Sequence, residues 1–321
     1  MISLPIFPPQ ASDVAWQVDL LFIILVALSG FFTSIVVALI IYFGIRYRRG
    51  NAVDRSNAPT TSLKVETSWM FGLLVLGMGT YVAATIIYFN MYRPRANDVL
   101  VYVVGQQWMW KIQHPEGPGE INTLHLPVGR TTRLVLISED VIHSLFVPAW
   151  RLKMDVLPGR YTNLWVRPTE VGEYHIFCAE FCGTDHAGMI GTVVVMEPAA
   201  YQNWLSAGGA DAAGSGGAGP AEAGEALFTQ LGCSSCHVGG AGTLAPPLEG
   251  LFGSQVPLEG GETVTADENY IRESILFPQE QIHEGYSPVM PSYQGRVSEE
   301  QLIQLVDYIR SLGGEAGSEQ P

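Results

Sequence analysis

Two long apolar runs near the N-terminus dominate the hydropathy pattern of this chain. No Asp, Glu, Lys or Arg occurs in residues 20–45 or 67–92, and each run has 26 residues rich in Leu, Ile, Val, Phe and Ala. A helix needs roughly 20 apolar residues to cross the hydrocarbon core of a bilayer. We therefore predict two transmembrane helices, at about 16–46 and 67–92, within an N-terminal segment spanning 1–95.

The basic residues around these runs predict the topology. The segment before the first run has no Lys or Arg, whereas the loop between the runs carries Arg46, Arg48, Arg49, Arg55 and Lys64. By the positive-inside rule that loop is cytoplasmic and both termini lie outside. Because the first 15 residues lack the basic start of a secretory signal, we expect the first run to be a retained helix.

The pattern changes to short β-rich runs after the second helix. Gly, Pro, Asn and Asp separate these runs, which fall at 99–105, 131–138, 160–166, 172–178 and 189–196. Several short strands at such spacing favour an antiparallel sandwich or barrel. We expect one β domain over residues 96–200.

A third pattern follows the β-rich region. We predict a Gly/Ala-rich linker at 201–220, because 14 of its residues include six Gly and five Ala and cannot build a core. Helix-like segments then fill 221–313, and the last of them begins with Ser298 and Gln301 in the spacing of a capping box. The final eight residues, 314–321, form a tail. This predicts a small helical domain on a flexible tether.

Charge and cysteine content narrow the function. The chain has 321 residues and a net charge of −14, and residues 97–321 hold 27 acidic against 10 basic side chains. Such a surface is a poor partner for nucleic acid. The four cysteines lie in two close pairs, which indicates two local sites rather than long disulfide staples: Cys178, Cys182, Cys233 and Cys236.

The first cysteine pair belongs to a cluster of soft metal ligands. Within 12 residues the chain places two thiols, one imidazole and one thioether, at Cys178, Cys182, His186 and Met189. Copper favours this ligand set. A disulfide or a zinc site is the alternative. A second imidazole has to come from elsewhere; His143 is the best placed, and His175 is its rival.

The second pair forms the motif Cys233-Ser-Ser-Cys236-His237, the attachment signature of c-type haem. Two thiols bind the haem vinyl groups in such a site, and the imidazole becomes an axial iron ligand. Met290 and His283 are the candidates for the sixth ligand, and Met290 is favoured because it suits a high-potential electron carrier. Zinc knuckles and thiol-redox sites can show the same spacing.

The copper motif and its surroundings resemble subunit II of the haem-copper oxygen reductases. The resemblance covers residues 14–200 and rests on His-Ser-x₃-Pro from His143 and on the loop from Cys178 to Met189. It implies a cupredoxin-like Greek-key sandwich that holds the binuclear copper centre CuA. Cys178 and Cys182 would bridge the two coppers, and His143 and His186 would each cap one. Met189 and the backbone carbonyl of Glu180 would be weak ligands.

The same resemblance implies roles outside the copper site. It places the Glu180 carboxylate on a magnesium or manganese ion at the border with the catalytic subunit. Trp108 would be the residue through which electrons reach CuA, although Gln106 and Met109 depart from the family's usual His and Tyr. Glu66 would lie at the mouth of a proton path. Glu139 and Asp140 would belong to a surface that docks basic cytochrome c.

Residues 221–313 resemble the small all-α class I cytochromes c, with Pro246 on the proximal side of the haem. A CuA domain fused to haem c resembles the caa3-type cytochrome c oxidases. The resemblance implies a multidomain protein of the bacterial inner membrane, with subunit I and subunit III as partners and a cytochrome c or quinol-oxidising complex as donor. Electrons would pass from haem c to CuA and on to subunit I, where O₂ reduction drives proton pumping.

Two other interpretations stay open from the sequence. A CuA-bearing nitric oxide reductase subunit shares the copper loop. A stand-alone, membrane-anchored electron shuttle or copper-binding protein would need neither Glu66 nor the Glu180 carboxylate. The strongly acidic haem domain, with 15 acidic and three basic residues from Ala221 onward, predicts electrostatic recruitment of a basic donor.

Overall fold

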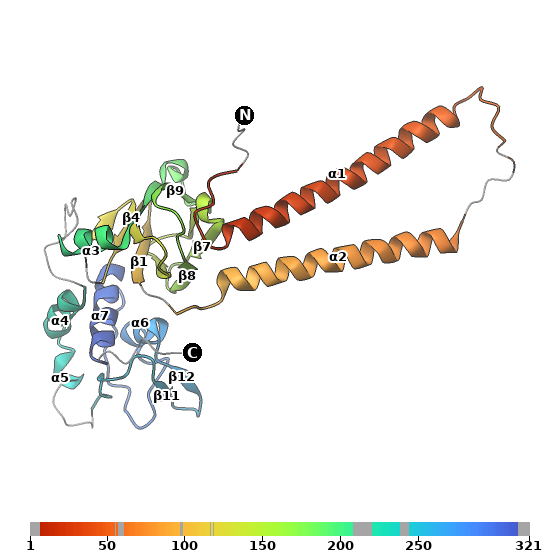
Figure 1. Cartoon of the computed structure of the whole chain (residues 1–321). Helices are drawn as coiled ribbons and strands as arrows, with labels where there is room; N and C mark the ends of the chain where they lie inside the picture. The colour runs from red at the N-terminus through yellow and green to blue at the C-terminus, as the bar shows by residue number, and fades with distance from the viewer. Residues whose placement is uncertain are drawn as a thin grey trace. The chain divides into compact units, whose positions relative to one another are not determined.

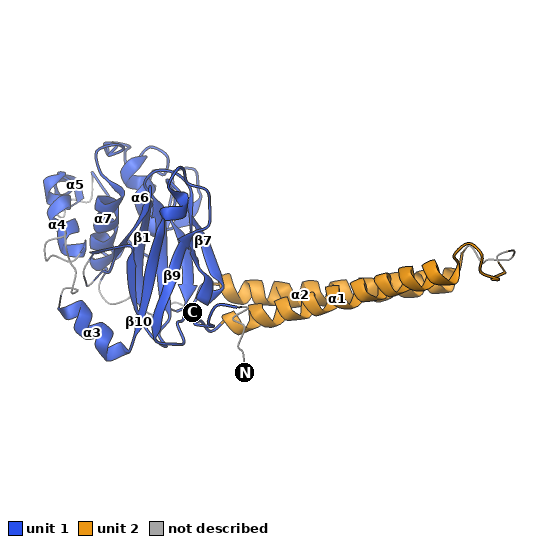
Figure 2. Ribbon diagram, turned by 90° about the horizontal axis from the view of Figure 1, so that it is seen from above, with its two compact units in different colours: residues 1–13, 94–321 blue, residues 14–93 orange. Residues whose placement is uncertain are grey.

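A computed structural model describes residues 7–54, 56, 61–96, 99–115, 117, 119–207, 220–237 and 244–313 (Figure 1). It divides into two compact units. One contains residues 14–93, and the other contains residues 1–13 and 94–321 (Figure 2). Most of the linker predicted from composition, and the predicted tail, lie outside the described residues.

The smaller unit consists of two long helices, α1 (Ala15–Arg46) and α2 (Leu63–Tyr92). Both are long and apolar enough to cross a membrane. Most of their large apolar side chains are exposed, as expected for helices whose side chains contact lipid and not the rest of the protein. The α2 helix starts four residues earlier than the uncharged run, because Lys64 and Glu66 take part in its first turn.

The larger unit begins with a sandwich of two five-stranded sheets. The first sheet has the order β3-β2-β1-β5-β8 and the second the order β4-β10-β9-β6-β7. The strands of the first sheet are Val99–Gln106 (β1), Met109–Gln113 (β2), Gly119–Ile121 (β3), Thr132–Ser138 (β5) and Thr162–Val166 (β8). Those of the second are Thr123–Pro127 (β4), His143–Val147 (β6), Leu152–Val156 (β7), Gly172–Cys178 (β9) and Ile190–Met196 (β10). The cupredoxin-like sandwich expected from the sequence is thus present.

The sandwich is mostly antiparallel, as the strand spacing favoured, but it also contains two parallel pairs. β1 pairs in parallel with β5, and β4 pairs in parallel with β10. Parallel neighbours need long crossover connections, and here the chain crosses from one sheet to the other between them. Short 3₁₀ turns, η1 (Pro148–Trp150) and η2 (His186–Gly188), interrupt the connections around β6 and β10.

Residues just before α1 pack on the sandwich. Ala11 donates its N–H to the carbonyl of Ala149 at 2.9 Å, and the Ser12 hydroxyl donates to the carbonyl of Trp150 at 2.8 Å. Both residues are buried. Asp13 forms an ion pair of 2.6 Å with Arg95. The segment before α1 therefore packs on the β domain, and an ion pair joins it to the segment after α2.

A short helix, α3 (Pro198–Ser206), follows β10 and buries Tyr201. Residues 201–206 were expected to be linker, and this was wrong: Tyr201 and Trp204 give the segment an apolar face that packs on β-strand residues, including His125, whose ring stacks on Trp204 at 4.5 Å. Only the Gly/Ala-rich part from 207 onward lacks such side chains.

The C-terminal domain contains α4 (Pro220–Gln230), α5 (Ser234–His237), α6 (Glu268–Leu276) and α7 (Glu299–Ser311). Ser298 and Gln301 form the predicted capping box at the start of α7. The domain is helical, as the sequence predicted, and it also contains one small hairpin that was not predicted, β11 (Gln255–Pro257) with β12 (Thr263–Thr265). Its core packs α4, α6 and α7 around Phe228, Ile271, Leu302, Leu305 and Val306.

Candidate metal centre and haem pocket

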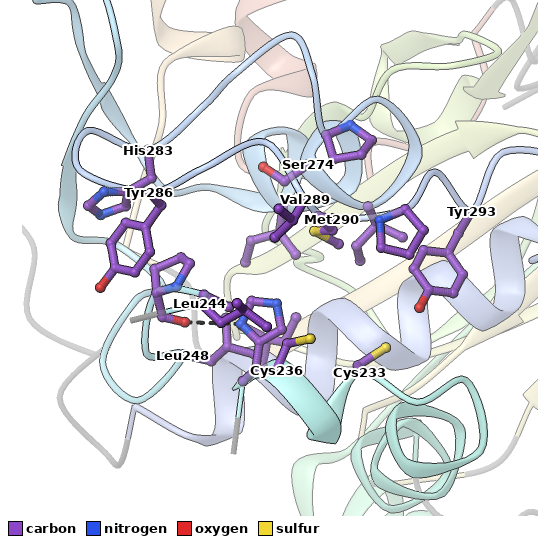
Figure 3. A pocket seen from close by; sticks show the side chains of 18 of the residues that line it. Cys233, Cys236, Leu244, Leu248, Ser274, His283, Tyr286, Val289, Met290 and Tyr293 are labelled. Atoms are coloured by element: carbon purple, nitrogen blue, oxygen red, sulfur yellow. Dashed lines mark hydrogen bonds between the residues drawn. The ribbon is translucent and has the colours of Figure 1, made fainter. Parts of the chain in front are cut away.

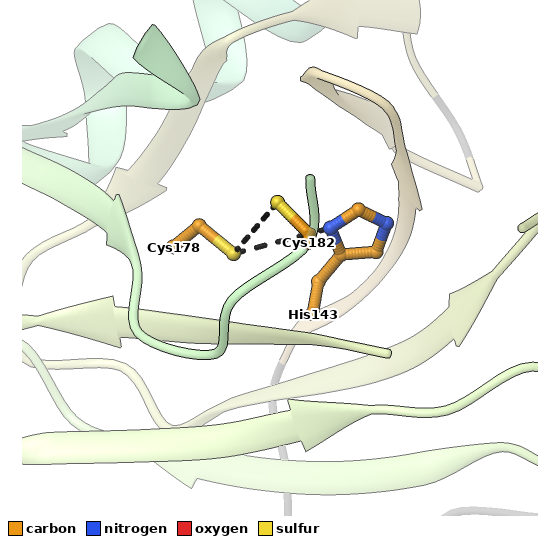
Figure 4. A group of neighbouring side chains, drawn as sticks. All are labelled: His143, Cys178 and Cys182. Carbon is orange, nitrogen blue, oxygen red and sulfur yellow. Dashed lines mark hydrogen bonds between the residues drawn. The ribbon is translucent and has the colours of Figure 1, made fainter. Parts of the chain in front are cut away.

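The copper candidates meet at one end of the second sheet. Cys178 ends β9, His143 begins β6, and the loop to β10 returns Cys182 beside them (Figure 4). The Cys178 Sγ lies 3.7 Å from the Cys182 Sγ and 3.9 Å from the His143 Nδ1. Both cysteines are free thiols, so the alternative of a disulfide between them is not realised. Three metal-ligating atoms therefore converge at a buried point.

The rest of the loop adds donors around Cys182. The His186 Nδ1 lies 3.4 Å and the Met189 Sδ 3.8 Å from the Cys182 Sγ. The carbonyl of Glu180 accepts from the Cys178 Sγ at 3.2 Å. All six donors that the sequence singled out are thus brought together. His175 lies on the exposed side of β9, opposite Thr192, and takes no part.

The two thiols of this cluster differ in how readily they ionise. Burial opposes ionisation of Cys178, but hydrogen bonds from His143 and from backbone N–H groups outweigh it and lower the pKa of this thiol. Burial and the neighbouring Cys178 raise the pKa of Cys182. A bound metal ion deprotonates its thiol ligands, so both thiols can ionise when a metal is present. Soft, buried thiolates with imidazole and thioether fit copper.

Asp140 fixes the ring of His143. Its Oδ1 lies 2.7 Å from the His143 Nε2, so the Nδ1 of the same ring is left to face the thiols. Burial raises the pKa of Asp140, but bonds from the Gln107 N–H and from His143 lower it below its usual value. Carboxylates that orient a ligating histidine in this way also raise its basicity. The sequence reading had given Asp140 only a docking role; its spacing three residues before His143 was the available signal.

A second contact joins the loop to the β1–β2 turn. The side-chain amide of Gln107 donates to the carbonyl of Cys182 at 2.7 Å. Gly183 has a φ of +118°, and a Cβ there would lie 2.9 Å from the Gln107 Nε2 and 3.4 Å from the Trp108 ring. Trp108 therefore lies directly against the copper loop, where the sequence placed an electron-transfer residue. Nothing in the sequence indicated the role of Gln107.

The two remaining site candidates have simpler surroundings. The Glu180 carboxylate is exposed on the copper loop. The Glu66 Oε1 accepts the N–H of Ser62 at 3.2 Å, which caps the start of α2. Large apolar side chains are exposed on and beside the copper loop, with Phe181 77% and Ile190 51% exposed. Such a patch is typical of a surface that a partner covers.

The C-terminal domain surrounds a cavity of about 470 Å³. Cys233, Cys236 and His237 line one side of it, and Met290 lines the other (Figure 3). The His237 Nδ1 lies 3.0 Å from the carbonyl of Pro246, which leaves its Nε2 to face the cavity. Apolar residues of α6 and α7 complete the walls. The volume, the two thiols and the oriented imidazole fit a c-type haem.

Met290 and His283 differ in their position around this cavity. Figure 3 shows Met290 across from the two cysteines, whereas His283 lies to one side against Tyr286. The His283 Nδ1 is bonded to the carbonyl of Glu284 at 3.0 Å. Met290 also packs against the domain core. The arrangement favours Met290 as the sixth iron ligand.

Glu120 joins two histidines at the edge of the sandwich. Its carboxylate oxygens lie 2.9 Å from the His114 Nε2 and 2.5 Å from the His125 Nδ1. The His114 Nδ1 also contacts the Tyr201 hydroxyl of α3 at 3.1 Å. This cluster fastens α3 to the sheet, and sequence reasoning did not find it because its members lie far apart or in ordinary strand positions.

Comparisons with known proteins agree with this arrangement. Residues 120–197 match the family described as cytochrome c oxidase subunit II, periplasmic domain, and residues 221–313 match the cytochrome c family. The cytochrome c oxidase subunit 2 of Alkalihalophilus pseudofirmus is 30% identical over 328 residues, covering 97% of this chain and 91% of that protein. The heme-copper oxidase subunit 2 of Aeropyrum pernix is 26% identical over 221 residues, covering 63% of this chain and 92% of that protein.

Among solved structures, the periplasmic domain of subunit II of cytochrome oxidase from Bradyrhizobium japonicum is similar. It has a TM-score of 0.34 and 27% sequence identity, and the match covers 36% of this chain and 95% of that chain.

Proposed function

Since this chain belongs to the cytochrome c oxidase subunit 2 family, we propose that it is the electron-input subunit of a haem-copper terminal oxidase. One observation carries the proposal: a buried cluster of thiol, imidazole and thioether groups occurs in the same chain as a cysteine-lined haem pocket. The fused cytochrome c domain favours an oxidase of the caa3 type. We propose that O₂ is reduced in the partner subunit I and not in this chain.

The copper ligands we propose are His143, Cys178, Cys182, His186 and Met189, with the carbonyl of Glu180 as a further weak donor. Cys178 and Cys182 would supply thiolates to the copper, and the bound copper would supply one-electron redox chemistry. The protein's contribution is rigidity: Asp140 holds the His143 ring, and Gln107 holds the Cys182 carbonyl. A ligand set that barely moves suits electron transfer rather than substrate binding.

In the C-terminal domain, Cys233 and Cys236 would attach the haem, and His237 and Met290 would be its axial ligands. The Pro246 carbonyl holds the proximal ring in place. A Met ligand raises the reduction potential relative to a second His, which suits delivery to a high-potential copper centre. Electrons would then pass from the haem domain to CuA, for which Trp108 is the proposed contact, and on to subunit I.

We propose the full assembly as follows. Subunit I and subunit III lie in the membrane beside α1 and α2, and the exposed apolar end around Phe181 faces subunit I. There the Glu180 carboxylate would hold magnesium or manganese, and Glu66 would open a proton path. Both termini would lie on the periplasmic side. The packing of Ala11 and Ser12 on the same β domain that follows α2 supports this topology.

The donor would be a basic cytochrome c or a quinol-oxidising complex. The haem domain has 15 acidic and three basic residues from Ala221 onward, and such an excess steers basic partners. Leu244 and Val289 line the haem cavity and are each 55% exposed, so they mark the face at which a donor could approach.

Purifying the membrane complex through a tag on this chain tests the proposal. We expect a partner with haem and copper to co-purify, and the complex to consume O₂ when a reduced basic cytochrome c is supplied. The rate of electron uptake should fall as salt rises, since screening weakens steering. A complex that reduces nitric oxide but not O₂, or a chain that purifies without a partner, would overturn it.

A further inference from the structure

The central strands of the first sheet are buried on both faces. On β1, Val101 and Val103 are fully buried, and Tyr102 and Val104, which alternate with them and so point to the opposite face, belong to a separate apolar cluster. Val135 and Ile137 of β5 and Tyr161 join that second cluster, and so does Ile303 of α7, which is 1% exposed. The haem domain thus supplies one member of an apolar cluster that the sheet cannot bury alone.

Charged and polar groups surround this shared cluster. The Arg133 Nη2 lies 3.0 Å from the Glu268 Oε2. From the haem domain, the Arg272 Nη1 donates to the carbonyl of Gly159 at 2.7 Å. The Asn269 Oδ1 accepts the Tyr161 N–H at 2.9 Å. Glu268 and Arg272 are at most 4% exposed. Charges buried this deeply are costly unless their partners are in place, so they select one orientation.

Tyr102 connects the two domains at the centre of the contact. Its hydroxyl donates to the Asp307 Oδ1 at 3.2 Å and accepts from the Arg310 Nη1 at 3.1 Å. Asp307 and Arg310 also form an ion pair with each other. Burial raises the pKa of Tyr102 well above its ordinary value, so it stays protonated and can donate. Figure 2 shows α7 next to β1, as these contacts require.

The signs of the charges match across the contact. The sandwich contributes Arg133 and Lys111, and the haem domain contributes Glu268 and Glu300. The Lys111 Nζ lies 2.8 Å from the Glu300 Oε1 and 3.3 Å from the Glu139 Oε2. Glu139, which the sequence suggested as part of a surface for a basic cytochrome, therefore already has a basic partner next to the chain's own haem domain.

We propose that the outer face of β1, β5 and β8 is a permanent docking surface for the haem domain of the same chain. The haem domain then transfers electrons from one fixed docked position and does not move about on the linker. The electron transfer from this position rests on the proposed function, whereas the docking itself does not rest on it. A soluble cytochrome cannot use this face while the haem domain covers it, so we expect external donors to reduce the haem domain.

The test uses the full chain in detergent with a site-specific protease sequence inserted within residues 208–217. After cleavage at near-physiological salt, we expect the haem domain to co-elute with the membrane-anchored part in size-exclusion chromatography. Arg133→Glu should release at least roughly tenfold more haem domain, because it places a second carboxylate opposite the buried carboxylate of Glu268. Arg130→Glu is the matched control: it makes the same charge change at an exposed position of the sandwich and should release no more than the parent.

Two further arms keep the outcome decisive. Combining Arg133→Glu with Glu268→Arg should restore retention, which separates a lost contact from a misfolded sandwich. Hydrogen exchange at β1 in the uncut chain should rise in Arg133→Glu and not in Arg130→Glu. Release of the parent's haem domain on cleavage, or equal release by both variants, would overturn the proposal.

Mixing differently tagged chains before cleavage tests whether each haem domain docks on the sandwich of its own chain. We expect each haem domain to stay with its own sandwich, and exchange between chains would overturn docking within one chain. None of these readouts depends on O₂ reduction. The experiments can therefore refute the docking without refuting the oxidase role, and they can refute the oxidase role without refuting the docking.

Discussion

The copper site and the haem pocket of this chain position their candidate ligands in different ways. In the copper site, donor atoms from β6 and one loop lie within 3.9 Å of a neighbouring donor, at the end of a sandwich whose core lies elsewhere. In the haem pocket, the candidate ligands stand on opposite walls of a cavity of about 470 Å³ that the domain core itself forms. The copper site therefore lies outside the core of its domain, whereas the haem pocket lies within the core of its domain.

This difference predicts how each region responds to losing its cofactor. Cys178→Ser should remove copper completely and leave the sandwich folded, because the large buried side chains of its core do not depend on the metal. Metal analysis and thermal unfolding of the variant check this. Thr184→Ser, at an exposed position of the same loop, should keep the copper. A Cys178→Ser chain whose sandwich unfolds would show that the copper is structural.

The double change Cys233→Ser and Cys236→Ser should affect its domain more broadly. Covalent haem should be lost, and the helical domain should also lose roughly 3 kcal/mol or more of unfolding free energy, the scale expected for a large unfilled core cavity. Haem staining of a denaturing gel and denaturant unfolding measure the two effects. Unchanged stability would mean that the pocket does not need its haem, and the contrast with the copper site would disappear.

Replacing the proposed sixth haem ligand should have an effect of intermediate size. Met290→His should keep a low-spin haem and lower its midpoint potential by a sizeable fraction of the ~0.8 V range that axial ligands control. His283→Ala should leave the potential and the optical spectrum unchanged, since its ring lies to one side with Tyr286. A spectral change in His283→Ala with none in Met290→His would reverse the assignment.

Asp140 provides a smaller test on the copper side. Asp140→Asn keeps the shape but weakens the bond to the His143 Nε2, and copper affinity should fall by roughly 10- to 100-fold. Competition with a copper chelator measures the affinity, and the EPR spectrum reports the altered ligand field. Glu139→Gln, one residue earlier, should change neither, because that carboxylate contacts Lys111 instead. Equal effects of the two variants would mean that only the net charge matters.

The smallest expected effect concerns Glu120. Burial raises the pKa of this carboxyl, but its bonds with His114 and His125 outweigh that and lower it. Its contribution to stability is therefore present above the ordinary carboxyl pKa and is lost as the pH falls through the lower, folded value. Glu120→Gln should cost about 1.5–3 kcal/mol at pH 7. The gap between variant and parent, measured by denaturant unfolding, should close at acid pH; a constant gap would contradict this.

The sequence predicted the local features of this molecule well. Cys178, Cys182, His186 and Met189 lie within one loop, and Cys233 to His237 within one turn, so spacing alone brings their side chains together. The two long helices and the α7 capping box also depend only on neighbouring residues. The sandwich was expected, but its parallel pairs were not, because short runs carry no information about which strand lies beside which.

Contacts between distant residues were harder to predict. The apolar run of β1 is continuous, which is typical of a strand buried on both faces. That signal was available but did not reveal what covers the second face. Tyr102 meets Asp307 across 205 residues of sequence, and α3 packs where the linker had been expected, because only the folded sheet gives Tyr201 and Trp204 a surface to bury against.

We propose that this one chain carries both redox centres. Metal analysis with optical and EPR spectra of the purified full-length chain tests this most directly. We expect two coppers per chain with a mixed-valence signal, together with one covalently bound haem c. One zinc and no haem would contradict it.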